Sequence, residues 1–225
     1  MLTVLWDNDG VLVDTEGMYF QACKEVLGTV GVDLTPAQFK DISLRQGVST
    51  FVLAAEQGVT AEDVARLRKQ RDRIYQQLLA AQSCVNDGAE AVVRALHGRV
   101  AMGVVTGSLR QHFEAAHAKS GLMKFMDFVL TREDYAKSKP DPEPYLTAMK
   151  RHHLRPDQCL VVEDSERGLA SATAAGIDCI ILLSDWTSGG NFDRAVAVVD
   201  NLFGVLAEVR KRVDAASANR SAKEL

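Results

Sequence analysis

Cysteines are few in this sequence and follow no paired spacing. The chain has 225 residues and four cysteines, and no two lie at the short intervals typical of a zinc site or a redox motif. This distribution argues against a disulfide scaffold and against a thiolate metal centre. We expect reduced thiols in or near the core of a cytoplasmic protein at Cys23, Cys84, Cys159 and Cys179.

Long apolar runs and basic tracts are also missing. No apolar stretch reaches the roughly 18 residues of a membrane span. The apolar start of the chain has no positive segment before it and is interrupted by Asp7, unlike a secretory signal. The formal net charge is -4, and no basic segment interleaved with aromatic residues indicates a nucleic-acid surface. We therefore expect neither a membrane nor a nucleic acid as a partner.

The composition is that of a globular protein, with 47% hydrophobic and 25% charged residues. From about residue 89 onward, helical and strand patterns alternate, and the strands are almost continuously apolar. This arrangement predicts an α/β fold, a Rossmann-like parallel sheet covered by helices on both faces. The expected strands are residues 2–6, 100–105, 128–130, 159–162, 178–182 and 197–199.

Residues 16–83 break this alternation, since their pattern is helical throughout. We expect them to form a helical cap inserted into a core made of residues 1–15 and 84–216, where a cap can act as a lid. The last expected helix covers about residues 203–213. The small and polar residues 217–225 are expected to form a disordered tail.

The first expected strand ends in a pair of carboxylates. Asp7 and Asp9 follow the apolar run, and Gly10 comes next. Chemistry in open α/β sheets sits beyond the carboxyl ends of the strands, and a buried acid without a partner is costly. A calcium loop is disfavoured because Val11 occupies a ligand position. The remaining alternative for this segment alone is a solvated turn.

The next expected strand ends carry groups suited to an anion. Thr106, Gly107 and Ser108 supply hydroxyls and backbone amides at the start of a helix, which is typical of a phosphate site. Lys139 can neutralise a carboxylate and a phosphoryl group, and Pro140 stiffens its approach. The alternatives are a capped helix start for the first segment and a solvated lysine for the second.

A further strand end carries the adjacent acids Glu163 and Asp164. Because adjacent carboxylates repel, a divalent cation explains the presence of both. An acid-rich helix start is the alternative. Each segment alone is compatible with its simpler explanation, but the ordered series of polar strand ends favours one shared active site.

With these motifs the sequence resembles the haloacid dehalogenase superfamily of Mg-dependent phosphohydrolases. It is most similar to the branch with a helical cap after the first motif, which includes sugar-phosphate phosphatases and β-phosphoglucomutase-like proteins. The resemblance covers nearly the whole chain and implies a Rossmann-like core with a mobile cap. The matching positions are Asp7, Asp9, Gly10, Thr106, Lys139, Pro140, Glu163 and Asp164.

The resemblance implies a role for each motif. Asp7 would attack phosphorus and form an aspartyl-phosphate, and Asp9 would act as general acid and then as general base. Mg²⁺ would be held by the Asp7 carboxylate, the Asp9 backbone carbonyl and Asp164, with Glu163 bound directly or through water. The residues that would hold the phosphate oxygens are Thr106, Gly107 and Lys139.

The resemblance favours a hydrolase of small phosphomonoesters such as sugar phosphates, acting as a monomer or weak dimer. Asp9 supports this reading, because family members that cleave other bonds lack an acid there. A β-phosphoglucomutase-like phosphomutase is the main alternative, although residues 14–20 lack the histidine usual in that group. A non-catalytic binding protein is a third hypothesis, which the intact motifs disfavour.

The cap is expected to select the substrate. Arg45 lies in residues 44–49, which resemble the cap loop that approaches the core in this branch. It would clamp a second anionic group or sugar hydroxyls, and a solvated arginine is the alternative. Arg68, Lys69 and Arg71 are interpreted as a solvated basic face.

Overall fold

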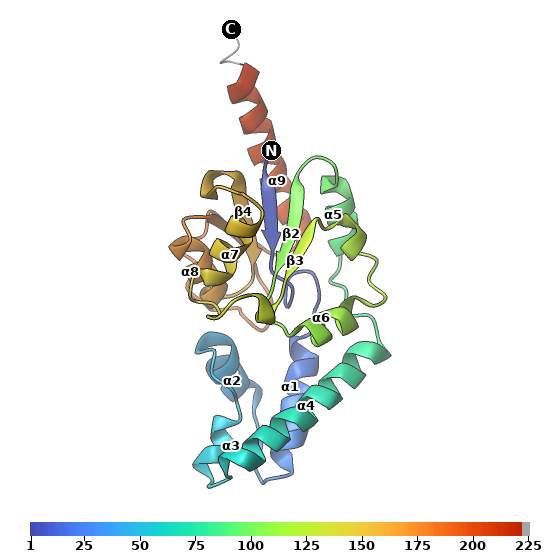
Figure 1. Ribbon diagram of the computed structural model, residues 1–225, viewed down its shortest axis with the longest axis vertical. Coiled ribbons are helices and arrows are strands. Elements are labelled where there is room, and N and C mark those ends of the chain that lie inside the picture. Colours follow the sequence, from blue (N-terminus) through green and yellow to red (C-terminus); the bar gives the residue numbers. More distant parts are fainter. Residues whose placement is uncertain (222–225) are drawn as a thin grey trace.

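The computed structural model describes residues 1–221 and contains a six-stranded sheet with the strand order β3-β2-β1-β4-β5-β6 (Figure 1). Neighbouring strands are paired in parallel. This is the Rossmann-like α/β core that the alternating pattern predicts. The strands are β1 (Thr3–Trp6), β2 (Ala101–Val105), β3 (Phe128–Leu130), β4 (Cys159–Glu163), β5 (Asp178–Leu182) and β6 (Ala197–Val199).

Helices lie between consecutive strands up to β5, a loop joins β5 to β6, and helices pack on both faces of the sheet. The helices of the core are α5 (Ala89–Leu96), α6 (Arg110–His117), α7 (Glu143–Arg151), α8 (Glu166–Ala174) and α9 (Leu202–Ser221). The short helical turns are η2 (Met123–Phe125), η3 (Arg132–Asp134) and η4 (Pro156–Gln158).

Strand β1 lies inside the sheet, between β2 and β4, and all its residues are buried. Successive side chains point to opposite faces. Val4 and Trp6 pack in the apolar layer that includes residues of α5 and α9. Leu5 packs in the layer that includes residues of α7 and α8. Burial on both faces explains why the strand is a continuous apolar run rather than an alternating one.

The strand order reverses at β1. The chain runs outward from β1 to β2 and β3, and then crosses to β4 on the other side of β1. Ligands of open α/β sheets bind at such a switch point, beyond the carboxyl ends of the strands. Residues that follow β1, β2 and β4 therefore meet at one edge.

Between β1 and α5 lies a helical group set apart from the sheet (Figure 1). It has its own apolar core, which includes Leu27, Phe39 and Phe51. Its elements are α1 (Glu16–Gly28), α2 (Pro36–Phe39), the π-helical turn η1 (Lys40–Arg45), α3 (Val52–Glu56) and α4 (Ala61–Ala81). The helical character expected for this segment is therefore present.

The helical group is held against the core by contacts with the loop after β5. The ring of Trp186 packs on Phe20 and Phe39, with ring centroids 5.7 Å and 5.5 Å away. Lys40 Nζ donates a hydrogen bond of 2.5 Å to the carbonyl of Asp185. The helical group thus covers the carboxyl edge of the sheet.

The C-terminal helix is longer than expected. Helix α9 continues to Ser221, so residues 217–221 are helical and the prediction of a disordered tail is wrong for them. Ala215, Ala216 and Ala218 are strong helix formers, which favours propagation beyond the packed part of α9. The rest of the predicted tail, residues 222–225, lies outside the described residues. Across the described chain, none of the helices combines the length and apolar character needed to span a bilayer.

A buried histidine on α6 fixes the loop after β1. His117 is only 8% exposed, and its Nε2 lies 2.7 Å from Asn8 Oδ1. Its Nδ1 lies 2.9 Å from the hydroxyl of Ser120. Since an amide oxygen only accepts, Nε2 carries the proton and Nδ1 accepts from Ser120. Burial lowers the pKa of His117 to about 4, so the ring is neutral in the folded protein.

His117→Gln should weaken the acid sensitivity of the fold. The pKa of His117 is about 4 when folded and about 6.5 in an unfolded chain, so the unfolded state binds more protons between these pH values. This group should therefore lower the free energy of unfolding by about 2 kcal/mol between pH 7 and pH 5. Urea unfolding of both proteins at both pH values measures the difference. If the free energy of unfolding fell equally in the two proteins between pH 7 and pH 5, the lowered pKa of His117 would be contradicted, because the other titrating groups are present in both.

Candidate active site

The loop after β1 places Asp7 at the floor of a cavity. The backbone N–H of Asp7 donates to the carbonyl of Val162 at 2.9 Å, which continues the pairing of β1 with β4. Gly10 then turns the chain with a φ of +78°, and a Cβ on Gly10 would lie 2.1 Å from Asp164 Oδ2. Glycine is therefore required here both for the turn and for the close approach to Asp164.

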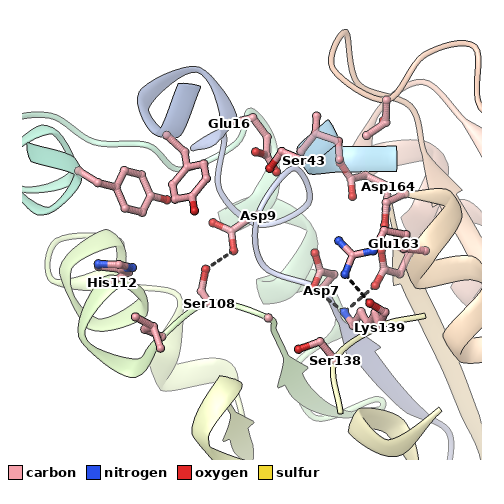
Figure 2. A pocket seen from close by; sticks show the side chains of 18 of the residues that line it. Asp7, Asp9, Glu16, Ser43, Ser108, His112, Ser138, Lys139, Glu163 and Asp164 are labelled. Carbon is pink, nitrogen blue, oxygen red and sulfur yellow. Dashed lines mark hydrogen bonds and ion pairs between the residues drawn. The ribbon is translucent and has the colours of Figure 1, made fainter. Parts of the chain in front are cut away.

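Lys139 joins Asp7 to the end of β4. Its Nζ donates to Asp7 Oδ1 at 2.7 Å and to Glu163 Oε1 at 2.6 Å (Figure 2). It also donates to the carbonyl of Val105 at 2.9 Å. Burial acts to lower the pKa of Lys139, but the charges of Asp7 and Glu163 outweigh it and hold the pKa above its ordinary value. Lys139 is therefore a charged ammonium between two buried carboxylates.

Glu163 is 1% exposed and is surrounded by hydrogen-bond donors. Besides Lys139, its Oε1 accepts from the hydroxyl of Tyr145 at 2.8 Å. Its Oε2 accepts from the hydroxyl of Ser165 at 3.0 Å and from the N–H of Asp164 at 3.3 Å. The first turn of α8 packs directly on this carboxylate, because a Cβ on Gly168 would lie 1.8 Å from it. Helix α8 begins at Glu166, because Ser165 caps it.

Asp164 differs from Glu163 in having an unsatisfied oxygen. Its Oδ2 is buried and accepts no hydrogen bond from the described residues. Burial raises the pKa of Asp164 well above its ordinary value, and the charges of Glu163 and Asp7 add to the rise. One ligand atom from each of Asp7, Glu163 and Asp164 lies within 4.8 Å of the others. Buried oxygen ligands gathered in this way suit a hard divalent cation.

The pKa of Asp7 is also shifted. Burial raises it to about 7; Lys139 opposes this rise, and the charges of Glu163 and Asp9 add to it. An acid in this environment is ionised more readily when positive charge is close. Asp7 therefore depends on its cationic neighbours for the charged form.

Three hydroxyl groups fix the carboxylate of Asp9. Thr15 Oγ1 donates to its Oδ1 at 2.5 Å. Ser108 Oγ donates to its Oδ2 at 2.6 Å (Figure 2). Thr106 Oγ1 lies 3.3 Å from the same Oδ2. Asp9 therefore keeps a fixed orientation beside Asp7 while still lining the cavity.

The three residues after β2 are placed differently from one another. Thr106 is 1% exposed, and besides its contact with Asp9 its hydroxyl accepts from the N–H of Ser108 at 3.0 Å. It is absent from the cavity lining in the described part of the chain, whereas Gly107 and Ser108 line it. A Cβ on Gly107 would meet nothing within 4 Å. Gly107 is therefore open to the cavity, whereas Thr106 is buried and helps to fix the carboxylate of Asp9.

The cavity has a volume of about 360 Å³ and is enclosed by the core and the helical group together. Of the residues expected from the motifs, it brings together Asp7, Asp9, Gly107, Lys139, Glu163 and Asp164. The cavity is also lined by residues that the motifs do not predict, among them Glu16, Tyr19, Arg71, Asp72, Tyr75 and His112.

The interpretation of Arg71 as part of a solvated face is wrong, since its side chain is only 11% exposed. The sequence does contain a pattern that predicts the burial of Arg71. Leu67 and Tyr75 are buried in α4, and Arg71 lies between them at intervals of four residues, which places all three on one face of the helix.

The structure does not bring Arg45 to the cavity. Arg45 ends the π-helical turn η1, and its side chain is 59% exposed. Its guanidinium lies 3.5 Å from the carboxylate of Glu166 and 3.8 Å from that of Asp41. Among the described residues it is not part of the cavity lining, because these carboxylates hold it at the rim between the helical group and α8.

Comparison with known proteins identifies the family. Residues 4–182 match the family model described as haloacid dehalogenase-like hydrolase. The chain belongs to this family. The family resemblance inferred from the motifs is therefore confirmed.

Relatives in this family carry phosphatase names. The chain is 30% identical over 182 residues to the fructose-1-phosphate phosphatase of Escherichia coli, which covers 79% of this chain and 94% of that protein. It is 29% identical over 215 residues to a validoxylamine A 7'-phosphate phosphatase of Streptomyces hygroscopicus, covering 92% and 94%. The β-phosphoglucomutase structure of Clostridium difficile has the same fold, with a TM-score of 0.79, 18% identity and coverage of 97% and 100%.

Proposed function

We propose that this protein is a Mg²⁺-dependent phosphatase that hydrolyses monophosphate esters of sugars or similar small metabolites through an aspartyl-phosphate on Asp7. The observation that carries the proposal is the position of Asp7 in the cavity, with Lys139 on one of its oxygens and the fixed carboxylate of Asp9 beside it. Membership of the family and the phosphatase names of its relatives support this reading.

In this mechanism Asp7 attacks phosphorus and the ester oxygen leaves. Asp9 gives its proton to the leaving oxygen, and later takes one from the water that hydrolyses the aspartyl-phosphate. The hydroxyls of Thr15 and Ser108 keep Asp9 aimed at the cavity during both steps. Lys139 binds the phosphate oxygens by its charge. The backbone at Gly107 also binds them, because this position is open to the cavity.

The residues at the end of β4 fit a divalent cation. The Oδ2 of Asp164, which accepts no hydrogen bond within residues 1–221, and the carboxylate of Asp7 offer oxygen ligands. We assign the backbone carbonyl of Asp9 to the same site. Glu163, whose oxygens already accept from several donors, holds Lys139 and completes the site directly or through water. A bound Mg²⁺ screens the charge of Asp7 from the phosphate dianion.

We further propose that residues 16–83 act as the cap. They supply one wall of the cavity and contact the core through Trp186 and Lys40. A wall that covers the reacting groups excludes water from the site.

Asp7→Asn should abolish phosphate release while the protein stays folded. A panel of hexose, pentose and polyol phosphates with Mg²⁺, assayed for inorganic phosphate and for isomerised sugar phosphate, measures the effect. We expect a loss of about 10³-fold or more, because the amide is not a nucleophile. The matched control is Asp14→Asn, an exposed acid in the same loop, which should retain turnover. Normal turnover by the Asp7 variant would refute the proposal, and isomerised product without phosphate release would favour the mutase.

Mg²⁺ should stabilise the protein through Asp164. At a Mg²⁺ concentration 100 times the Kd, binding adds about 2.7 kcal/mol to the free energy of unfolding. Asp164→Asn should remove this gain. Since burial and neighbouring charge raise the pKa of Asp164, the variant without Mg²⁺ should be at least as stable as the unchanged protein.

Thermal and urea unfolding with Mg²⁺ and with EDTA measures both effects without any enzymatic assay. An equal Mg²⁺ gain in both proteins would show that Asp164 is not a ligand. A large loss of stability in the variant without Mg²⁺ would show that Asp164 has a structural role instead.

A further inference from the structure

The cavity has a second polar group of residues away from Lys139. Figure 2 shows Ser108 and His112 on the opposite side of the cavity from Lys139 and Glu163. His112, on α6, faces residues of α4 there: its Nε2 lies 3.8 Å from Asp72 Oδ1. Its ring also meets the edge of Tyr75, with centroids 5.0 Å apart. The core and the cap thus build this end of the cavity jointly.

Arg71 is held rigidly at this end. Its Nε donates to Asp72 Oδ1 at 2.8 Å, and its Nη1 donates to the hydroxyl of Tyr19. The guanidinium carbon lies 4.6 Å from the centre of the Tyr19 ring. A side chain fixed by several polar contacts and a ring face loses little freedom when a ligand binds.

The charge of Arg71 is already neutralised. Asp72 pairs with it at 2.8 Å, and both side chains are largely shielded from solvent. Burial lowers the pKa of His112 from its ordinary value, although Asp72 opposes this, and the shift favours the uncharged imidazole. Among the described residues lining this end of the cavity, Arg71 is the sole arginine or lysine.

The cavity as a whole is rich in acids. Its described lining contains six acidic residues, Asp7, Asp9, Glu16, Asp72, Glu163 and Asp164, but only three strong cations, Arg71, Lys139 and Arg167. Lys139 is paired with two of the carboxylates. At the Asp7 end, Lys139 together with a divalent cation can balance the charge of a single phosphate. A second anionic group at the His112 end would meet a neutralised ion pair and nearby acids, which oppose it.

We propose that Tyr19, Arg71, Asp72 and His112 form a leaving-group site that selects phosphomonoesters of neutral polyhydroxylated alcohols over bisphosphates and phosphorylated acids. This proposal rests on the proposed phosphatase function. The site alternates donors and acceptors: the guanidinium donates, the Asp72 carboxylate accepts, and the hydroxyl and imidazole can do either. Sugar and polyol hydroxyls have the same dual character. The neutral ion pair supplies hydrogen bonds without attracting an anion.

The test compares kcat/KM for matched esters. The pairs are fructose 1-phosphate with fructose 1,6-bisphosphate, and glucose 6-phosphate with 6-phosphogluconate. The unchanged protein should favour the first ester of each pair, whose leaving group is uncharged, at least tenfold. Asp72→Asn, which keeps the shape but frees the charge of Arg71, should lower that preference at least tenfold.

A second variant tests recognition of hydroxyl groups. Arg71→Met should lower the kcat/KM for the best sugar phosphate, relative to that for p-nitrophenyl phosphate, at least tenfold and mainly through KM. Because this ratio is taken within one protein, partial unfolding does not change it. The matched control is Arg68→Met, an exposed arginine on the same helix, which should leave both ratios unchanged.

The outcomes separate the two proposals. Preference of the unchanged protein for the esters with a charged leaving group, or unaltered ratios in both variants, would overturn the leaving-group site while the phosphatase function stands. If the unchanged protein released no phosphate from any ester, the phosphatase function itself would fail, and the leaving-group proposal with it.

Discussion

The ion pairs of Lys139 are the interaction on which the rest of the site depends. Asp7 and Glu163 are both buried, and each lies within 2.7 Å of the Lys139 ammonium. A buried charge without a partner costs several kcal/mol, and these two acids stand beside a third, Asp164. Without Lys139 these buried carboxylates would repel one another with no cation between them. The fold therefore keeps acids in a protein interior by placing one cation between them.

The sheet makes this arrangement possible. Because β1 pairs with both β2 and β4, the residues that follow three strands share one edge. Two glycines then let backbone and carboxylate approach closely. Gly10 leaves room for Asp164, and Gly168 leaves room for Glu163. The clustering of these acidic side chains thus follows from the strand order and from the two glycines, which leave room for them.

The sequence was informative about the core because parallel strands carry a strong signal. Continuous apolar runs predicted the strands, and polar residues directly after them predicted which side chains meet. The pattern could not show that Thr106 would turn its hydroxyl to Asp9 while Gly107 remained open to the cavity. That outcome depends on rotamers set by neighbours from other strands.

The cap was less predictable. Its helices were expected, but the prediction that selected Arg45 rested on its position in a loop, and the structure pairs Arg45 with Glu166 at the rim. The cavity instead contains Arg71, which looked like one member of a solvated basic stretch. Its spacing from Leu67 and Tyr75 favoured the buried face, yet His112, which lies 3.8 Å from the neighbouring Asp72, comes from a distant helix of the core. Contacts of this kind depend on how the cap packs on the core, which local sequence does not reveal.

The most direct test of the central claim is to trap the covalent intermediate. The protein would be mixed with Mg²⁺ and a turned-over sugar phosphate, quenched in acid within the first turnovers, digested and analysed by mass spectrometry. The account predicts one added phosphoryl group on the peptide that contains Asp7, located on that residue. Phosphate release with no phosphorylated peptide, or with the phosphoryl group on another residue, would contradict it.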